Sequence, residues 1–154
     1  MVCDSNTVET SLLEYAEAKR DSSFSSALVI SDWYDLLPAN DSSVQKPLEW
    51  PQNFANAGKP GVYFGFDAAE SLLYVGMSQT DVQSRLGRYF GYVSGRSGPC
   101  KIKDIFPPWK TRPRFVRTVA TRDPREAPLL ESFLIGVLQP PENTRGVSRP
   151  KPTQ

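Results

Sequence analysis

The chain has 154 residues, 39% hydrophobic and 23% charged, which fits one soluble globular domain with a modest core. No apolar run approaches the ~20 residues that a transmembrane helix needs, and the acidic N-terminal residues do not fit a secretory signal. The absence of histidine excludes Ser-His-Asp and Cys-His catalysis and any histidine-ligated metal. We therefore expect an intracellular, cytoplasmic protein with no membrane partner.

The net charge of +1 hides two parts of opposite sign. Residues 1–60 contain four Lys or Arg and nine Asp or Glu, whereas residues 61–154 contain fourteen and eight. The second part is therefore where a polyanion is expected to bind. Cys3 and Cys100 lie far apart and lack the spacing of a zinc site, so we interpret them as free thiols.

The first sixty residues predict a helix followed by irregular structure. Thr10 can cap a short helix over 10–20, and residues 27–37 fit either a strand or a short helix. Four prolines between 38 and 60 predict a loop. We expect three segments: an N-terminal extension over 1–58 that packs on the domain, the domain itself over 59–146, and a disordered tail over 147–154.

A β-hairpin organises the second part. Two apolar runs, 61–66 and 72–77, are rich in strand-forming residues and flank a short polar break at 67–71. Each run contains a tyrosine with a glycine nearby, namely Tyr63 with Gly61 and Tyr74 with Gly76. The simplest interpretation of the glycines is close backbone approach.

Two helices and a third strand follow the hairpin. Asp81 can cap a helix from Val82 to about Val93, and residues 101–105 fit a helical turn. Residues 114–121 alternate and are β-branched, which predicts a strand. Asp123 can cap a last helix with Glu126 in the capping-box position. The residues of this helix that we expect to face the core are Leu130, Phe133, Leu134 and Val137 or Leu138.

The order strand, strand, helix, strand, helix predicts an α+β fold with a small three-stranded antiparallel sheet flanked by helices. Residues of possible chemical use follow in the same order. The hairpin carries GVY and YVG, the helix DVQSRLGRYF carries Arg85, and the run EAPLLESFLIGVLQPPENT carries Glu131 and Asn143. Each of these residues or triplets alone is a weak signal.

This pattern resembles the GIY-YIG nuclease superfamily, with GVY at 61–63 in place of GIY and YVG at 74–76 in place of YIG. The resemblance covers residues 61–143. One departure is a stretch between Gly76 and Arg85 that is one residue longer than expected. At the position one helical turn after the arginine, often His or Tyr in the family, this chain has Tyr89.

The resemblance implies an endonuclease that hydrolyses DNA phosphodiester bonds with Mg²⁺ or Mn²⁺. It implies that Glu131 is the sole protein ligand of the metal, since a carboxylate suits Mg²⁺. Arg85 would grip a nonbridging phosphate oxygen through its planar guanidinium. Tyr63 is the candidate for activating water and Tyr74 for orienting water or phosphate, while Tyr89 could share the first role. Asn143 completes the candidate catalytic set.

The same residues have interpretations without catalysis. The tyrosines could be ordinary strand aromatics, and Arg85 could be a solvated helix charge. Glu131 lies beside the apolar stripe, where an unpaired carboxylate is costly, so an ion pair with Arg85 would explain it equally well. Asn143 could cap the chain turn after Pro140 and Pro141.

Cations beyond the candidate catalytic set form a basic belt interleaved with Tyr92 and Trp109, which fits phosphate contacts with occasional base stacking. A solvated surface without a ligand is the alternative. The predicted nucleic-acid-binding members of the belt are Arg88, Arg96, Lys101, Lys103, Lys110, Arg112, Arg114 and Arg117.

Three functions therefore compete. The first is a metal-dependent endonuclease acting on DNA, and the second is a catalytically inactive nucleic-acid-binding module with the same fold. The third is an interaction protein in which the acidic N-terminal segment covers the basic face. The small size also predicts either selectivity from loops and a homodimer, or a partner protein that targets the chain.

Overall fold

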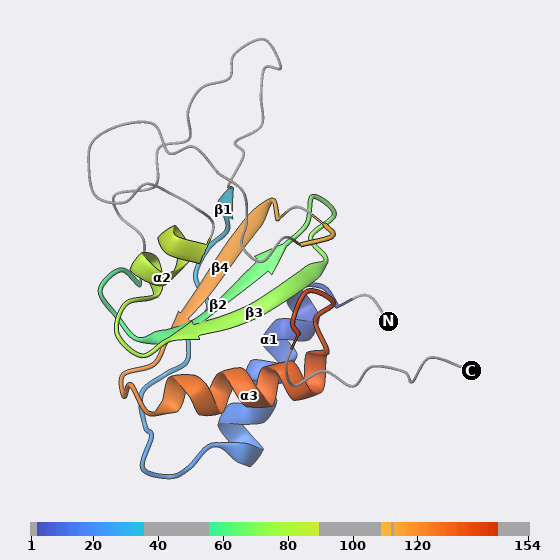
Figure 1. Cartoon of the computed structure of the whole chain (residues 1–154). Coiled ribbons are helices and arrows are strands. Elements are labelled where there is room, and N and C mark those ends of the chain that lie inside the picture. Colours follow the sequence, from blue (N-terminus) through green and yellow to red (C-terminus); the bar gives the residue numbers. More distant parts are fainter. Residues whose placement is uncertain (1–2, 36–55, 90–108, 112, 145–154) are drawn as a thin grey trace.

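The computed structural model describes residues 3–35, 56–89, 109–111 and 113–144. These residues form an α+β fold in which helices flank an antiparallel sheet, as predicted (Figure 1). The elements, in chain order, are α1 (Ser5–Glu14), the π-helix η1 (Tyr15–Lys19), β1 (Tyr34–Asp35), β2 (Gly61–Phe66), β3 (Leu72–Ser78), α2 (Val82–Tyr89), β4 (Phe115–Ala120) and α3 (Glu126–Leu138). The predicted loop before residue 56, the end of the 82–93 helix, the 101–105 turn and the 147–154 tail lie outside the described residues.

The sheet has the order β1-β4-β2-β3, with every pair antiparallel. Three strands, β4, β2 and β3, are the ones that we predicted, and the two-residue β1 extends the sheet at the β4 edge. The hairpin between β2 and β3 is confirmed. Its turn forms because the Asp67 carboxylate accepts hydrogen bonds from the backbone N–H groups of Ala69 and Ser71, at 2.8 and 2.9 Å.

The N-terminal helix begins earlier than predicted. Asp4, rather than Thr10, is the cap, because its carboxylate accepts hydrogen bonds from both the backbone N–H and the hydroxyl of Thr7. The sequence left open whether residues 27–37 form a strand or a short helix. The described part of this segment, up to residue 35, contains extended structure and no helix. Ile30 forms a bridge with Val119, and β1 pairs with β4.

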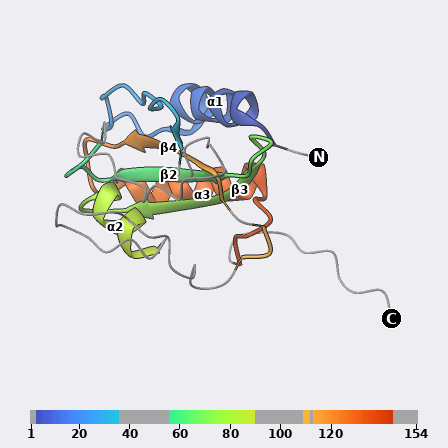
Figure 2. The same cartoon turned by 90° about the horizontal axis from the view of Figure 1, so that it is seen from above.

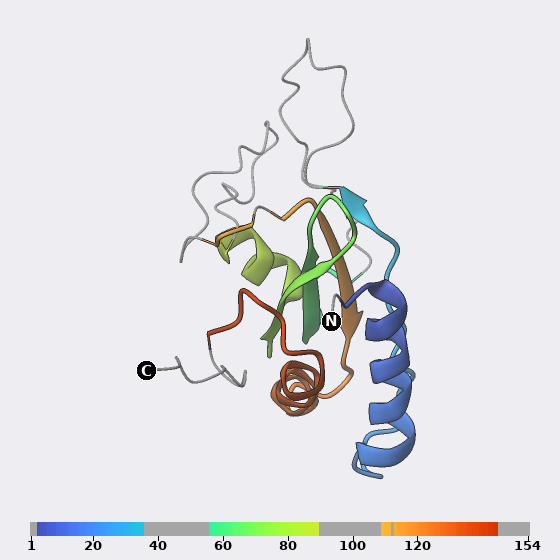
Figure 3. The ribbon, with the colours of Figure 1, turned by 90° about the vertical axis from the view of Figure 1, so that its right-hand side faces the viewer.

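The two faces of the sheet carry different helices. Figures 2 and 3 show α1 on one side of the sheet and α2 on the other, with α3 running beside β3 on the side of α1. We call the side of α1 the core face, which bears Val62, Phe64 and Phe66 of β2. Strand alternation places Tyr63 on the opposite side, which we call the tyrosine face.

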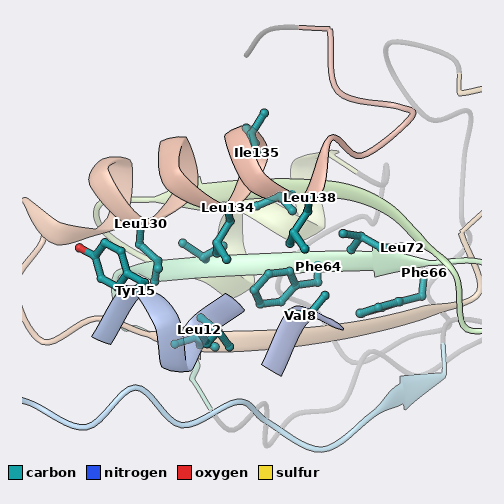
Figure 4. Packing of buried hydrophobic residues seen from close by; sticks show 13 residues of the cluster. Val8, Leu12, Tyr15, Phe64, Phe66, Leu72, Leu130, Leu134, Ile135 and Leu138 are labelled. Carbon is teal, nitrogen blue, oxygen red and sulfur yellow. The ribbon is translucent and has the colours of Figure 1, made fainter. Parts of the chain in front are cut away.

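The main core lies between α1, α3 and the core face (Figure 4). Val8, Leu12 and Tyr15 from the N-terminal segment pack with Phe64 and with the α3 stripe in this one cluster. The predicted stripe is confirmed, with Phe133 packed against the cluster and Leu138 rather than the exposed Val137 at its end, while Ile135 was not predicted. The buried residues of the stripe are Leu130, Leu134, Ile135 and Leu138. The boundary at residue 58 stays a prediction, although α1 shares this core.

The start of α3 differs from the predicted capping box. The Asp123 carboxylate accepts a hydrogen bond from the backbone N–H of Arg125 at 2.9 Å, so Asp123 does organise the turn. Glu126, however, does not reach back to a cap. Its fully buried carboxylate forms a two-point ion pair with Arg20, from the end of η1, because a buried charge needs a partner.

Candidate active site

The two tyrosines of the hairpin lie together on the tyrosine face. Tyr63 pairs across the sheet with Gly76 of β3, and Tyr74 lies two residues before that glycine. The ring centroids of Tyr63 and Tyr74 are 6.0 Å apart, with an angle of 30° between the ring planes. Tyr63 is 1% exposed and Tyr74 is partly exposed, so the second ring lies nearer to solvent.

The glycines of both triplets are required by close contacts. A Cβ atom on Gly76 would lie 2.5 Å from the Tyr63 hydroxyl and 2.7 Å from Cε1 of Tyr74. Gly76 therefore leaves room for the two rings rather than for a neighbouring backbone. At Gly61 the prediction of close backbone approach is confirmed, because a Cβ atom would collide with the carbonyl of Val119 on β4.

Helix α2 brings Arg85 to the tyrosine side. The predicted cap is confirmed: the Asp81 carboxylate accepts a hydrogen bond from the backbone N–H of Gln83, and a second from Gly58, both at 2.9 Å. Val82 and Leu86 are fully buried beneath the helix, whereas Arg85 is exposed. Tyr89 is the last residue of α2, and its side chain lies outside the described part of the chain.

Glu131 carries a carboxylate with a distinctive environment. It lies on α3, which packs on β3, the strand of Tyr74. Burial raises the pKa of Glu131, while the nearby positive charge of Arg85 opposes this shift. Arg85 and Glu131, from separate helices, thus act on one another electrostatically. No ion pair or hydrogen bond links the Glu131 carboxylate to any of the residues that the structure describes.

This environment fits a single-carboxylate metal site. A partly buried carboxylate whose charge is disfavoured by burial, and whose oxygens form no hydrogen bond with a described residue, can hold one Mg²⁺. This ion keeps several waters and takes phosphate oxygens as further ligands. The described residues contain no group of three or more His, Cys, Asp or Glu side chains that would form a cage. Any metal site there would therefore depend on Glu131 together with water and substrate.

Asn143 makes structural contacts, and its direct role in the site stays a prediction. Its side chain is 5% exposed and uses its amide on β3: Oδ1 accepts from the Val75 N–H at 2.9 Å, and Nδ2 donates to the Val75 carbonyl at 2.8 Å. Val75 lies between Tyr74 and Gly76. Asn143 therefore pairs with the backbone at the edge of the sheet, on β3, the strand that carries Tyr74.

The basic belt is smaller than predicted. Arg117 does not belong to it, because its side chain lies on the core face and is only 9% exposed. Its guanidinium binds Glu9 at 2.6 Å and the Ser31 carbonyl at 2.8 Å, which fastens the N-terminal segment to β4. Lys110 is exposed and Arg114 is partly exposed. The side chains of the other predicted members lie outside the described residues: Arg88, Arg96, Lys101, Lys103 and Arg112.

The sequence did not predict that Trp109 and Glu142 lie close to the tyrosine hairpin. Trp109 lies against Tyr74, with ring centroids 4.9 Å apart. Glu142 connects the segment of Trp109 to β3 by two hydrogen bonds. Its carboxylate accepts one from the backbone N–H of Thr111, and its own backbone N–H donates the other to the Leu73 carbonyl. The bulky aromatic character of Trp109 was a signal in the sequence. Glu142 gave none, because its partner lies 31 residues away.

The α+β fold and the order of Tyr63, Tyr74, Arg85 and Glu131 around β3 are consistent with the GIY-YIG resemblance. No family model and no solved structure matches the chain. The chain is similar to the UvrABC system protein C of Alcanivorax borkumensis, with 38% identity over 91 residues. That match covers 56% of this chain but only 13% of the relative. No helix among the described residues is both long and apolar enough to span a membrane.

Proposed function

We propose that this chain is a divalent-metal-dependent endonuclease of the GIY-YIG type that hydrolyses DNA phosphodiester bonds. The observation that carries the proposal is a partly buried carboxylate, Glu131, that has no described ion-pair partner and lies within the electrostatic influence of the exposed Arg85. These are the two charges that a hydrolytic phosphate site needs, one to hold a cation and one to bind the phosphate.

Glu131 would hold Mg²⁺ or Mn²⁺ through its carboxylate. The bound ion would supply Lewis-acid polarisation of the phosphate and stabilisation of the leaving oxygen. Burial disfavours the ionised carboxylate of Glu131 and raises its pKa, and a cation bound there would stabilise the ionised form. The structural alternative, an Arg85–Glu131 ion pair, has less support since no such pair occurs among the described contacts.

Arg85 would bind a nonbridging phosphate oxygen through its guanidinium, and its exposure leaves it accessible to DNA. Tyr74, the more exposed tyrosine, would orient the phosphate or the attacking water. Tyr63 would accept the proton of that water. A phenol has a pKa near 10, so this role requires the positive field of Arg85 and the cation to favour the phenolate.

The partial similarity to the UvrABC system protein C supports a nuclease-type, DNA-related function at a coarser level. Because the match covers 13% of that relative, we extend neither its whole activity nor its partners to this chain. The alternative that fits the same residues is a module that binds DNA without cleaving it.

The test is nicking of supercoiled plasmid by the full chain with Mg²⁺. We expect Glu131→Ala and Arg85→Ala to lose nicking by at least about a hundredfold, the scale of a lost electrostatic stabiliser. Leu13→Ala, at an exposed position on α1 on the other side of the sheet, should leave nicking unchanged. Nicking that survives both site changes would overturn the site assignment, and DNA binding without nicking by the wild type would favour the inactive module.

A further inference from the structure

Three aromatic rings form a row on the tyrosine face. The row runs from Tyr63 to Tyr74, at 6.0 Å between centroids, and on to Trp109 at 4.9 Å. Adjacent planes are inclined by 30° and 31°, and both distances lie in the range of interacting aromatic pairs. Exposure increases along the row, from the buried Tyr63 to the partly exposed Tyr74 and Trp109.

Glu142, in the segment after α3, links the backbone beside the last ring of this row to β3. Thr111, two residues after Trp109, donates its backbone N–H to the Glu142 carboxylate at 2.8 Å. The backbone N–H of Glu142 in turn donates to the Leu73 carbonyl at 3.0 Å, beside Tyr74 on β3. Trp109 is not among the described residues that form the main hydrophobic core cluster, and its side chain is partly exposed.

We propose that Trp109 determines specificity by stacking on an unpaired nucleobase, so that the preferred substrate is duplex DNA containing an unpaired nucleotide. This inference rests on the proposed function and names its substrate class. Inside an intact duplex both faces of a base are covered by its neighbours. A protein aromatic ring can therefore stack only on a base that has left the stack or lost a neighbour.

Two exposed cations fit the same substrate. Lys110, next to Trp109, is exposed, and Arg85 is exposed on α2. Cations at these positions bind phosphates without reading the base, whereas a tryptophan ring contacts the base itself. A base on Trp109 would place its own backbone near Tyr74, the tyrosine in contact with that ring. Trp109 thus couples recognition of a displaced base to the position of the phosphate.

The test measures binding without cleavage, using full-length Glu131→Gln protein and two DNA duplexes. In one duplex 2-aminopurine is the single unpaired nucleotide, and in the other it is paired. We expect binding to quench the unpaired 2-aminopurine and to favour that duplex by at least about fivefold, the lower end of base–aromatic stacking. In the Glu131→Gln background, Trp109→Leu should abolish both the quenching and the preference, and Trp109→Phe should retain most of them.

Two controls separate stacking from general binding. Lys110→Gln should weaken binding to both duplexes by the same factor, since a phosphate contact carries no base information. Far-ultraviolet circular dichroism should show that Trp109→Leu is folded, as expected for a residue outside the core cluster. Quenching and preference that persist in Trp109→Leu would overturn the proposal.

The two proposals fail separately. If wild-type protein nicks DNA but Trp109→Leu cleaves paired and unpaired duplexes in the wild-type ratio, this inference is wrong and the nuclease proposal stands. If the wild type never cleaves but still prefers the unpaired duplex through Trp109, the stacking proposal is supported and the nuclease proposal is wrong.

Discussion

The two glutamates of α3 differ in burial and in ion pairing, and only one of them is a candidate catalytic residue. Glu126 is fully buried and forms an ion pair with Arg20, so its charge is compensated within the protein. Glu131 is partly buried, its pKa is raised by burial, and no described residue forms an ion pair with it. A carboxylate kept in such an environment at a cost in stability is typical of a functional site.

The raised pKa of Glu131 makes stability depend on pH. As the pH rises above the ordinary glutamate value of 4.5, the unfolded chain loses this proton before the folded chain does. The contribution of Glu131 to the free energy of unfolding therefore falls with rising pH until the folded carboxyl has also ionised. Without metal, Glu131→Gln should be more stable than wild type at pH 7, and the difference should vanish below the ordinary value.

Urea unfolding of both proteins between pH 4 and 8 in the presence of EDTA measures this difference. A Glu131→Gln protein that is less stable than wild type at neutral pH would mean that the carboxylate has a stabilising partner. That outcome would remove the physical argument for a metal at Glu131.

Gly76 gives a second prediction at the residue scale. In Gly76→Ala the new methyl group would collide with the rings of Tyr63 and Tyr74, and overpacking of this kind costs about 1–3 kcal/mol. We expect reduced stability and loss of nicking as the tyrosines are displaced. Gly136→Ala is the matched control, because Gly136 is exposed on α3 with no atom within 4 Å of the added Cβ. The control should gain about 0.5–1 kcal/mol from helix propensity.

Unfolding free energies and nicking rates of the two alanine variants provide the comparison. Equal stability and activity in Gly76→Ala and wild type would show that the two rings are not confined by this glycine.

At the scale of elements, the N-terminal segment is fastened to the sheet and to α3 by buried arginines. Arg117 of β4 binds Glu9 of α1 at 2.6 Å and lies over the ring of Trp33, with 5.0 Å to the centroid. Arg20, at the end of η1, binds Glu126 at the start of α3 and donates to the Ser26 carbonyl. The segment before the hairpin is therefore joined to the fold by polar as well as apolar contacts.

Removing one partner of the Arg20–Glu126 pair should be costly. Arg20→Met leaves the fully buried Glu126 charge without its partner, and we expect a loss of about 3–5 kcal/mol in unfolding free energy. The double variant with Glu126→Met should recover much of this loss, since it removes the buried charge as well. Urea unfolding in a double-mutant cycle checks both values. Additive losses in the double variant would contradict the coupling.

Elements with strong local signals were predictable from the sequence. The hairpin follows from two apolar runs rich in strand-forming residues around a polar break, and β4 follows from period-two alternation. The Asp81 cap follows from its place before an amphipathic run. The start of α1 was missed because Asp4 and Thr10 are both competent caps, and only the packing of Val8 in the core selects the longer helix.

The candidate site was predictable as a set of residues but not as contacts. Tyr63, Tyr74, Arg85 and Glu131 were candidates because their order and spacing resemble those of the GIY-YIG superfamily. The true partners of Arg117 and Asn143 could not be found from the sequence, because they lie 108 and 68 residues away. A cation or an amide carries no sign of whether it faces solvent or a buried backbone.

At the scale of the whole molecule, one face of the sheet forms the hydrophobic core and the other carries the candidate site. The core face packs against α1 and α3, while the tyrosine face carries Tyr63, Tyr74 and α2 (Figure 3). Residues 3–35 are the described part of the acidic N-terminal segment. Their helix α1 lies on the core side of the sheet, so this helix does not cover the tyrosines. This arrangement weakens the hypothesis of an acidic N-terminal segment that covers the basic face, as far as residues 3–35 are concerned.

The most direct test of a hydrolytic site at Glu131 is plasmid nicking by the full chain, with Mg²⁺ or with EDTA, for wild type beside Glu131→Gln. Because this variant is expected to be at least as stable as wild type at pH 7, a loss of nicking reports on the site and not on unfolding. We predict nicking by wild type with Mg²⁺, none with EDTA, and at least about a hundredfold slower nicking by Glu131→Gln. Nicking by Glu131→Gln at the wild-type rate would contradict the assignment.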